Sequence, residues 1–117
     1  MSLCQIAQHT FLAQDLSSRS VVVDLGAHLG RFSHGIVDRF GCRSYAVEAN
    51  PSLCQRIESD PRISVFNMAI AATSGTVPLY LSSNYERSSI SASHFPISRR
   101  PSRYGRSHSV GSWPLPG

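Results

Sequence analysis

The sequence lacks lysine, closely spaced cysteines and long hydrophobic runs. Its 3 cysteines include no Cys-x-x-Cys pair, so we expect reduced thiols and no metal site. No apolar run approaches the roughly 20 residues of a membrane helix, and the first residues do not resemble a secretory signal. We therefore expect a cytoplasmic protein with no membrane partner. All 11 cationic side chains are arginines, from which we draw no functional conclusion.

The positive charge is concentrated near the C-terminal end. Up to Ile90 seven arginines are balanced by seven acidic residues, whereas four arginines and no acidic residue follow it, which accounts for the net charge of +4. Residues 91–117 also contain seven serines, four prolines and three glycines. Such a composition cannot bury enough apolar surface to offset the entropy of ordering the chain. We predict one folded domain over residues 1–90 and a disordered basic tail over residues 91–117.

Hydrophobic periodicity predicts an α/β fold with three parallel strands and two crossover helices between residues 20 and 70. The run SVVVDL over residues 20–25 is apolar almost throughout, as in a strand of a parallel sheet. Gly41 suits the end of one helix, while Asn50 and Pro51 suit the N-cap and first position of the next. The β-α-β-α-β order implies right-handed crossovers. The expected elements are a strand over 20–25, a helix over 31–40, a strand over 44–47, a helix from Pro51 to Asp60-Pro61 and a strand beginning at Ile63.

The segments that flank this region are predicted to form a helix and a hairpin. Apolar residues recur at helical spacing over residues 3–14, which indicates a short amphipathic helix. After the third strand, residues 69–72 and 77–81 are expected to pair around a tight turn that contains Gly75. Pro78 limits the second of these strands to an edge strand or an irregular strand, because proline cannot donate a backbone hydrogen bond.

Asp24, Gly26 and Gly30 form a D-x-G-x-x-x-G pattern directly after the first predicted strand. Glycine is needed where φ is positive or where a side chain would block a ligand. Backbone N–H groups beside a helix start can bind a phosphate or a carboxylate. The dinucleotide fingerprint would place a glycine at position 28, where this chain has His28. The pattern therefore favours a cofactor without a pyrophosphate.

Glu48 ends the second predicted strand, 24 residues after Asp24. In this topology an acid at that position lies beside the first loop and can accept hydrogen bonds from both hydroxyls of a ribose. A nucleoside cofactor with a free ribose and no diphosphate is consistent with S-adenosylmethionine. Asp24 would then face the cationic amino-acid end of that cofactor.

Three segments together resemble the front half of the FkbM-type S-adenosylmethionine-dependent methyltransferases, over about residues 10–90. They are VVVDLGAHLGRFS, YAVEANPSLCQRI and ISVFNMAIAATSGTVPLYLSS. The first family motif usually reads V-D-V-G-A-N-x-G, so His28 replaces an asparagine. The second usually reads E-P-N-P, so Ala49 replaces a proline. Asn67, Ala69 and Gly75 match the third segment, an N-x-A stretch followed by a glycine turn.

The resemblance implies part of a Rossmann-like class I methyltransferase fold and O-methyl transfer to a small-molecule or sugar hydroxyl. The residues that it assigns to the cofactor are Asp24, Gly26, His28 and Gly30 at the methionine end, Glu48 at the ribose and Asn67 at the adenine rim. The family continues with a lysine–aspartate–glutamate-glycine strand on the acceptor side, and nothing after Ile90 resembles it. We therefore expect residues 1–90 to be a truncated or frame-disrupted cofactor-binding domain.

Other interpretations of these residues stay open. His28 also suits a solvent-facing position at a helix start, and Asn67 suits a turn. A nucleotide-binding Rossmann-like module of oxidoreductase type is one alternative, although the missing middle glycine counts against it. A basic-tailed nucleic-acid-binding or interaction protein is another, which the charge-balanced region before Ile90 disfavours.

Overall fold

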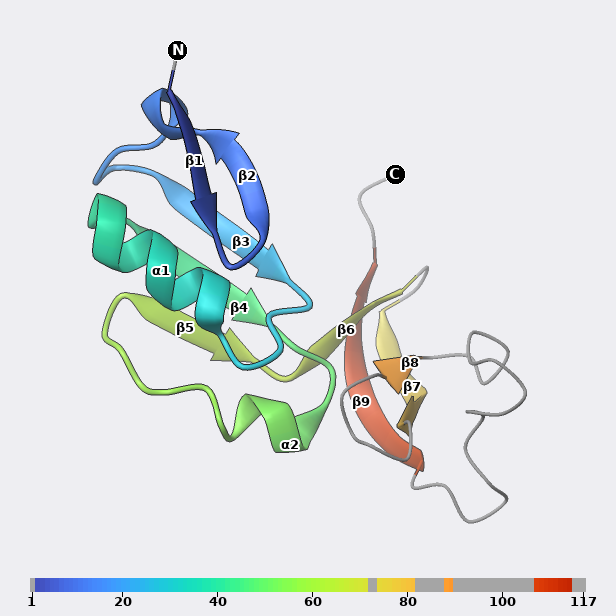
Figure 1. Cartoon of the computed structure of the whole chain (residues 1–117). Helices are drawn as coiled ribbons and strands as arrows, with labels where there is room; N and C mark the ends of the chain where they lie inside the picture. Colours follow the sequence, from blue (N-terminus) through green and yellow to red (C-terminus); the bar gives the residue numbers. More distant parts are fainter. Residues whose placement is uncertain (1, 72–73, 82–87, 90–106, 115–117) are drawn as a thin grey trace. The chain divides into compact units, whose positions relative to one another are not determined.

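The protein is described in a computed structural model over residues 2–71, 74–81, 88–89 and 107–114 (Figure 1). Its contacts divide the chain into two compact units. One comprises Met1–Glu48 and Ser52–Phe66, and the other comprises Ala49–Pro51 and Asn67–Gly117.

The first unit contains the predicted parallel sheet. Its strands are β3 (Val21–Leu25), β4 (Arg43–Val47) and β5 (Ile63–Phe66), in the order β3-β4-β5 and all parallel (Figure 1). Asp24 pairs with Ala46 in the register of β3 and β4. The α/β class and the three parallel strands are thus confirmed.

The two crossover segments differ in how much helix they contain. α1 (Arg31–Phe40) has the predicted length and ends at Gly41, which has a φ of +68° and donates its N–H to the Val37 carbonyl oxygen. α2 covers only Pro51–Cys54, so the prediction of a helix up to Asp60-Pro61 is wrong. The buried apolar side chains of this segment are Leu53 and Ile57. Because helices in proteins are stabilised mainly by packing of an apolar face, two such side chains do not support a longer helix.

The N-terminal segment forms a β-hairpin, and the prediction of a helix over residues 3–14 is wrong. β1 (Leu3–Ile6) pairs antiparallel with β2 (His9–Leu12), and a short 3-10 helix η1 (Ala13–Asp15) follows. Ala7 and Gln8 form the turn with φ values of +45° and +73°. Positive φ at both central residues is typical of two-residue hairpins. A short apolar pattern cannot separate a helix from a strand, and here packing against α1 selects the strands.

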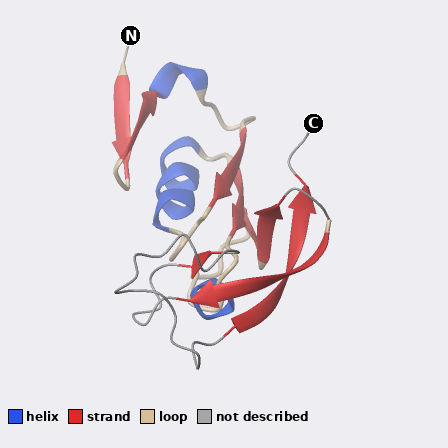
Figure 2. Cartoon of the chain, turned by 90° about the vertical axis from the view of Figure 1, so that its right-hand side faces the viewer, coloured by secondary structure: helices blue, strands red, loops and turns tan. Residues whose placement is uncertain are grey.

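α1 lies between the hairpin and one face of the sheet, since it contacts β1 on one side and β3, β4 and β5 on the other (Figure 2). A Cβ atom on Gly35 would collide with Cγ2 of Ile6, so the missing side chain lets β1 approach the helix. The core of this unit forms around α1 and consists of Ala27, Ile36, Val37, Cys42, Ala46, Ile57 and Ile63.

The opposite face of the sheet is exposed. Val21, Val23 and Leu25 are 59%, 58% and 56% exposed, and Tyr45 on β4 is 38% exposed. Successive strand residues point to opposite faces, so Val22 and Asp24 face α1, whereas Val21, Val23 and Leu25 face away from it. Within the described part of the chain, three apolar side chains of β3 are therefore left without a covering layer on this face.

The second unit contains a mixed sheet with the order β6-β9-β7-β8. Its strands are β6 (Met68–Ala71), β7 (Gly75–Leu81), β8 (Ser88–Ser89) and β9 (Ser107–Pro114). β9 lies between β6 and β7, parallel to the first and antiparallel to the second. The predicted hairpin of residues 69–72 with 77–81 is therefore wrong.

The same strand corrects the prediction of a disordered tail over residues 91–117. Residues 107–114 form β9 and pair with a strand on each side, and Ser112 is buried. Backbone hydrogen bonds to a neighbouring strand on each side stabilise β9, and such pairing cannot be predicted from amino-acid composition. The rest of the predicted tail lies outside the described residues.

Arg62 connects the end of α1 to the segment before β5. Its guanidinium donates to Asp60 Oδ1 and Oδ2 at 3.0 and 2.7 Å, to Asp38 Oδ1 at 2.7 Å and to the Val37 carbonyl oxygen at 3.0 Å. Hydrogen bonds from the Arg62 side chain and backbone lower the pKa of Asp60 well below its ordinary 3.8. The ionised form of Asp60 is therefore favoured in the folded state.

We expect acid to weaken the protein through Asp60. A depressed carboxyl pKa contributes stability that is present above pH 3.8 and is lost as the pH falls toward the lower folded pKa. Asp60→Asn should lower the urea midpoint at pH 7. The midpoint of this variant should also fall less than that of the wild type between pH 5 and about pH 2, the acid range in which such carboxyl groups titrate. The exposed Asp15, replaced by Asn, is the control. An Asp60→Asn variant with the wild-type acid dependence contradicts this prediction.

Gly35→Ala tests the approach of the hairpin to α1. Alanine favours a helix over glycine by roughly 1 kcal/mol, so an open site would gain stability. Here we expect a lower melting temperature, because the new Cβ displaces Ile6. Adding Ile6→Ala should make Gly35→Ala neutral or stabilising, as measured by a double-mutant cycle. A single Gly35→Ala variant that melts higher than wild type would show that β1 does not press on the helix.

Candidate functional site

The loop between β3 and α1 is held against the end of β4. Gly26, His28 and Gly30 have φ values of +76°, +55° and +77°. The N–H groups of Gly26 and Ala27 both donate to the Val47 carbonyl oxygen, at 2.8 and 3.0 Å. His28 adopts a left-handed conformation that is uncommon outside glycine, although histidine, like Asn and Asp, takes it more often than most residues. The loop therefore curls over the carboxyl end of the neighbouring strand.

The two glycines of the D-x-G-x-x-x-G pattern are required for different reasons. A Cβ atom on Gly26 would meet nothing within 4 Å, so only its positive φ favours glycine. A Cβ atom on Gly30 would lie 2.8 Å from Cγ2 of Ile57. Gly30 therefore serves both the backbone conformation and the packing of the second crossover against the start of α1.

Asp24 is the end of a buried hydrogen-bonded series. Its Oδ2 accepts the Ser33 hydroxyl at 2.7 Å, and Ser33 Oγ lies 2.8 Å from Ser44 Oγ. Asp24, Ser33 and Ser44 are 8%, 0% and 1% exposed. The sequence analysis identified Asp24 but missed both serines, because an isolated serine on a helix or a strand gives no recognisable signal.

Glu48 is also buried, at 6% exposed, and it binds the loop directly. Its Oε1 accepts the backbone N–H of His28 at 2.9 Å, and its own N–H donates to the Phe66 carbonyl oxygen at 3.0 Å. The carboxylate at the end of β4 thus stabilises the unusual conformation at His28. Asp24, Gly26, His28, Gly30 and Glu48 are brought together by the pairing of β3 and β4.

Asn67 belongs to the second unit. Its side-chain Nδ2 donates to the Ala49 carbonyl oxygen at 2.8 Å, and the residue is exposed. This contact joins two segments that are 18 residues apart in the sequence, and Asn67 is not among the residues that line the cavity described next.

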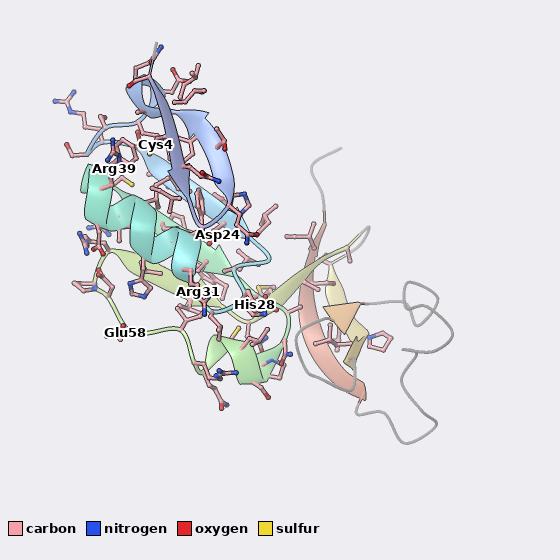
Figure 3. The ribbon with its side chains drawn as sticks, viewed as in Figure 1. Cys4, Asp24, His28, Arg31, Arg39 and Glu58 are labelled. Atoms are coloured by element: carbon pink, nitrogen blue, oxygen red, sulfur yellow. The ribbon has the colours of Figure 1, made fainter. Side chains whose placement is uncertain are left out.

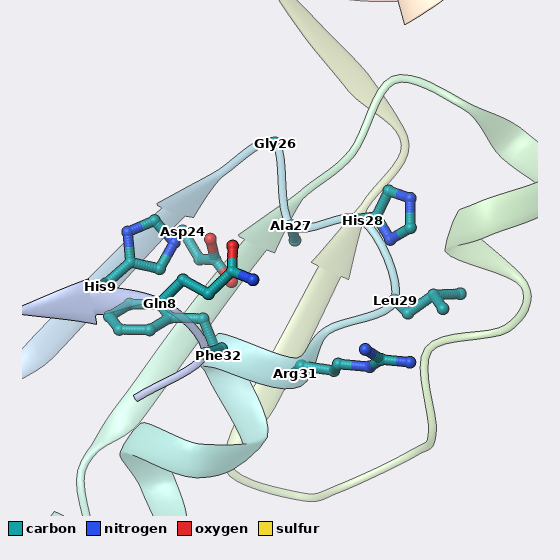
Figure 4. A pocket seen from close by; sticks show the side chains of 10 residues that line it. Gln8, His9, Asp24, Gly26, Ala27, His28, Leu29, Arg31 and Phe32 are labelled. Atoms are coloured by element: carbon teal, nitrogen blue, oxygen red, sulfur yellow. The ribbon is translucent and has the colours of Figure 1, made fainter. Parts of the chain in front are cut away.

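A cavity of about 280 Å³ lies beside the loop, between the start of α1 and the turn of the N-terminal hairpin (Figures 3 and 4). Asp24, Gly26 and His28 line it, whereas Gly30 and Glu48 do not. In Figure 4 the labelled Gln8, His9, Asp24 and Phe32 gather on one side of the loop, and His28, Leu29 and Arg31 lie on the other. The full lining is Ala7, Gln8, His9, Asp24, Gly26, Ala27, His28, Leu29, Arg31 and Phe32.

Gln8 and His9 are lining residues that the sequence analysis missed, because it assigned residues 3–14 to a helix. His9 packs edge-on against Phe32, with ring centroids 4.7 Å apart. The sequence signal that could have placed them in a hairpin is an alternation of apolar and polar residues.

No family model matches the chain, and neither a curated protein nor a solved structure matches it. No helix among the described residues is long and apolar enough to cross a membrane. The described residues also contain no group of three or more histidine, cysteine or acidic side chains that could hold a metal ion.

Replacing each glycine by alanine separates the two requirements on the loop. We expect Gly26→Ala to cost about 1–2 kcal/mol of unfolding free energy, the ordinary cost of a left-handed alanine. Gly30→Ala should cost more, because its Cβ also displaces Ile57. Urea denaturation of both variants measures the difference. Equal costs would mean that Ile57 moves aside freely.

Proposed function

We propose that the protein binds S-adenosylmethionine at the loop between β3 and α1 and belongs to the methyltransferases that transfer its methyl group to a small-molecule or sugar hydroxyl. One observation carries this proposal. Two buried carboxylates lie at the carboxyl ends of adjacent parallel strands, Asp24 near the end of β3 and Glu48 directly after β4. The loop that follows β3 has three positive φ angles and is bound by Glu48. Ligands of open α/β sheets bind at the carboxyl ends of the strands.

The amino-acid end of the cofactor fits the Asp24 side of the site. Asp24 is the one acidic residue among those that line the cavity. Its carboxylate offers a negative partner for an ammonium group, and charge-assisted hydrogen bonds of this kind are the stronger ones. The cavity of about 280 Å³ is close to the lower bound of small-molecule sites, roughly 300 Å³. It suits the amino-acid part of the cofactor, with the nucleoside beyond it.

Glu48 supports the proposal through its position and through its hold on the loop. It stands at the end of β4, the strand next to β3, where an acid can receive ribose hydroxyls. Its bond to the His28 N–H orders the loop in advance, which reduces the entropy that a ligand must overcome on binding. In this proposal Glu48 orders the loop and recognises the ribose.

His28 bears on the choice between this cofactor and a dinucleotide. The second glycine of the dinucleotide fingerprint lets the backbone approach the pyrophosphate. Here that position carries an imidazole that lines the cavity. This favours a cofactor without a pyrophosphate over the oxidoreductase alternative.

When bound, S-adenosylmethionine supplies an electrophilic methyl group to a nucleophilic oxygen. The residues of this loop contribute binding and orientation: Asp24 holds a cationic group, and Glu48 with the loop backbone fixes the nucleoside side. The acceptor class in this proposal follows from the family resemblance.

Calorimetry with S-adenosylhomocysteine tests the cofactor. We expect binding by the wild-type chain and a loss of about 1.5–3 kcal/mol in Glu48→Gln, the range for hydrogen bonds to a charged group. Glutamine keeps an oxygen that can accept the His28 N–H, so this variant removes charge while preserving the loop contact. Glu58→Gln, on an exposed residue, is the matched control. Equal affinities of wild type and Glu48→Gln would refute the ribose assignment, and preferential binding of NAD would favour the oxidoreductase alternative.

A further inference from the structure

We propose that Ser33 and Ser44 are positioning residues that aim the Asp24 carboxylate at the cationic group of the ligand. This inference rests on the proposed function, because it concerns how Asp24 would recognise the amino-acid end of the cofactor. Neither serine lines the cavity, so both would act through Asp24.

The direction of the hydrogen bonds follows from counting protons. The Ser33 hydroxyl has one proton, which it donates to Asp24 Oδ2 because an ionised carboxylate can only accept. The contact of 2.8 Å between Ser33 Oγ and Ser44 Oγ therefore requires Ser44 to be the donor. The series runs from Ser44 to Ser33 to Asp24, and each hydroxyl rotor is locked by the next.

The series leaves one carboxylate oxygen for a ligand. Oδ2 is occupied by Ser33, and no hydrogen bond to Oδ1 occurs within the part of the chain that the structure describes. Asp24 lines the cavity while Ser33 is fully buried behind it. A carboxylate fixed at its rear oxygen presents the other in a defined direction, which lowers the entropy lost when a cation binds.

Packing alone does not account for two hydroxyls at these positions. Ser33 lies on the face of α1 that buries Ile36 and Val37, and Ser44 is inward-facing on β4. A buried hydroxyl costs free energy unless it is hydrogen-bonded, and alanine would fill a small apolar position without that requirement. Within the described residues, the hydrogen-bond partners of the two serine hydroxyls are each other and Asp24.

The test compares two ligands that differ at the amino-acid end. S-adenosylhomocysteine carries the ammonium group, whereas 5′-methylthioadenosine has the same nucleoside without the amino acid. We expect Ser33→Ala to bind S-adenosylhomocysteine about tenfold more weakly, as for one lost hydrogen bond to a charged group, and to bind 5′-methylthioadenosine as wild type does. Ser33→Thr keeps the hydroxyl and should restore most of the affinity, and Ser64→Ala on β5 is the control.

Each outcome decides between the two proposals. If the wild-type chain binds neither ligand, the proposed function fails and this inference with it. If the wild type binds both but Ser33→Ala weakens both equally, or neither, the positioning role is overturned while the proposed function stands. Ser44→Ala provides a second variant should Ser33→Ala fail to fold: it should show a smaller loss confined to S-adenosylhomocysteine, and the absence of that selectivity would also overturn the inference.

Discussion

The parallel pairing of β3 with β4 is the interaction on which the site depends. It places Asp24 opposite Ala46 and brings the Val47 carbonyl oxygen within reach of the Gly26 and Ala27 N–H groups. Glu48 follows Val47 directly and accepts the His28 N–H from the same loop. One strand therefore supplies a backbone acceptor and a side-chain acceptor to the loop of the other, so the loop conformation is a consequence of strand register.

The part of the fold and site that could be predicted from sequence is the part governed by local rules. The Val-rich run before Asp24, the helix that ends at Gly41 and the strand before Glu48 each carry a pattern whose cause lies within a few residues. Their order then dictates parallel pairing, and parallel pairing brings Asp24 and Glu48 to the same sheet edge. The acids could be anticipated for that reason.

The parts that could not be predicted depend on partners distant in sequence. The apolar residues of 3–14 fit a helix equally well, and the approach of Ile6 to Gly35 decides for a hairpin. β9 has the composition of a disordered tail but pairs with β6 and β7. Likewise, Ser33 and Ser44 become meaningful only once α1 is packed on β4. In each case the structure is decided by a contact between segments that are distant in the sequence, and neither segment's own pattern predicts that contact.

The alternation along β3 links the site to the exposed face of the sheet. Val22 and Asp24 point toward α1, and Val21, Val23 and Leu25 point away and are more than half exposed. A shift of the β3 register by one residue would exchange the two sets and move Asp24 from the serines to the open face. The apolar residues on the open face contribute little burial to resist such a shift. The Ser33–Asp24 bond and the two bonds to the Val47 carbonyl oxygen favour the observed register, so the same polar contacts that shape the site also specify the pairing that creates it.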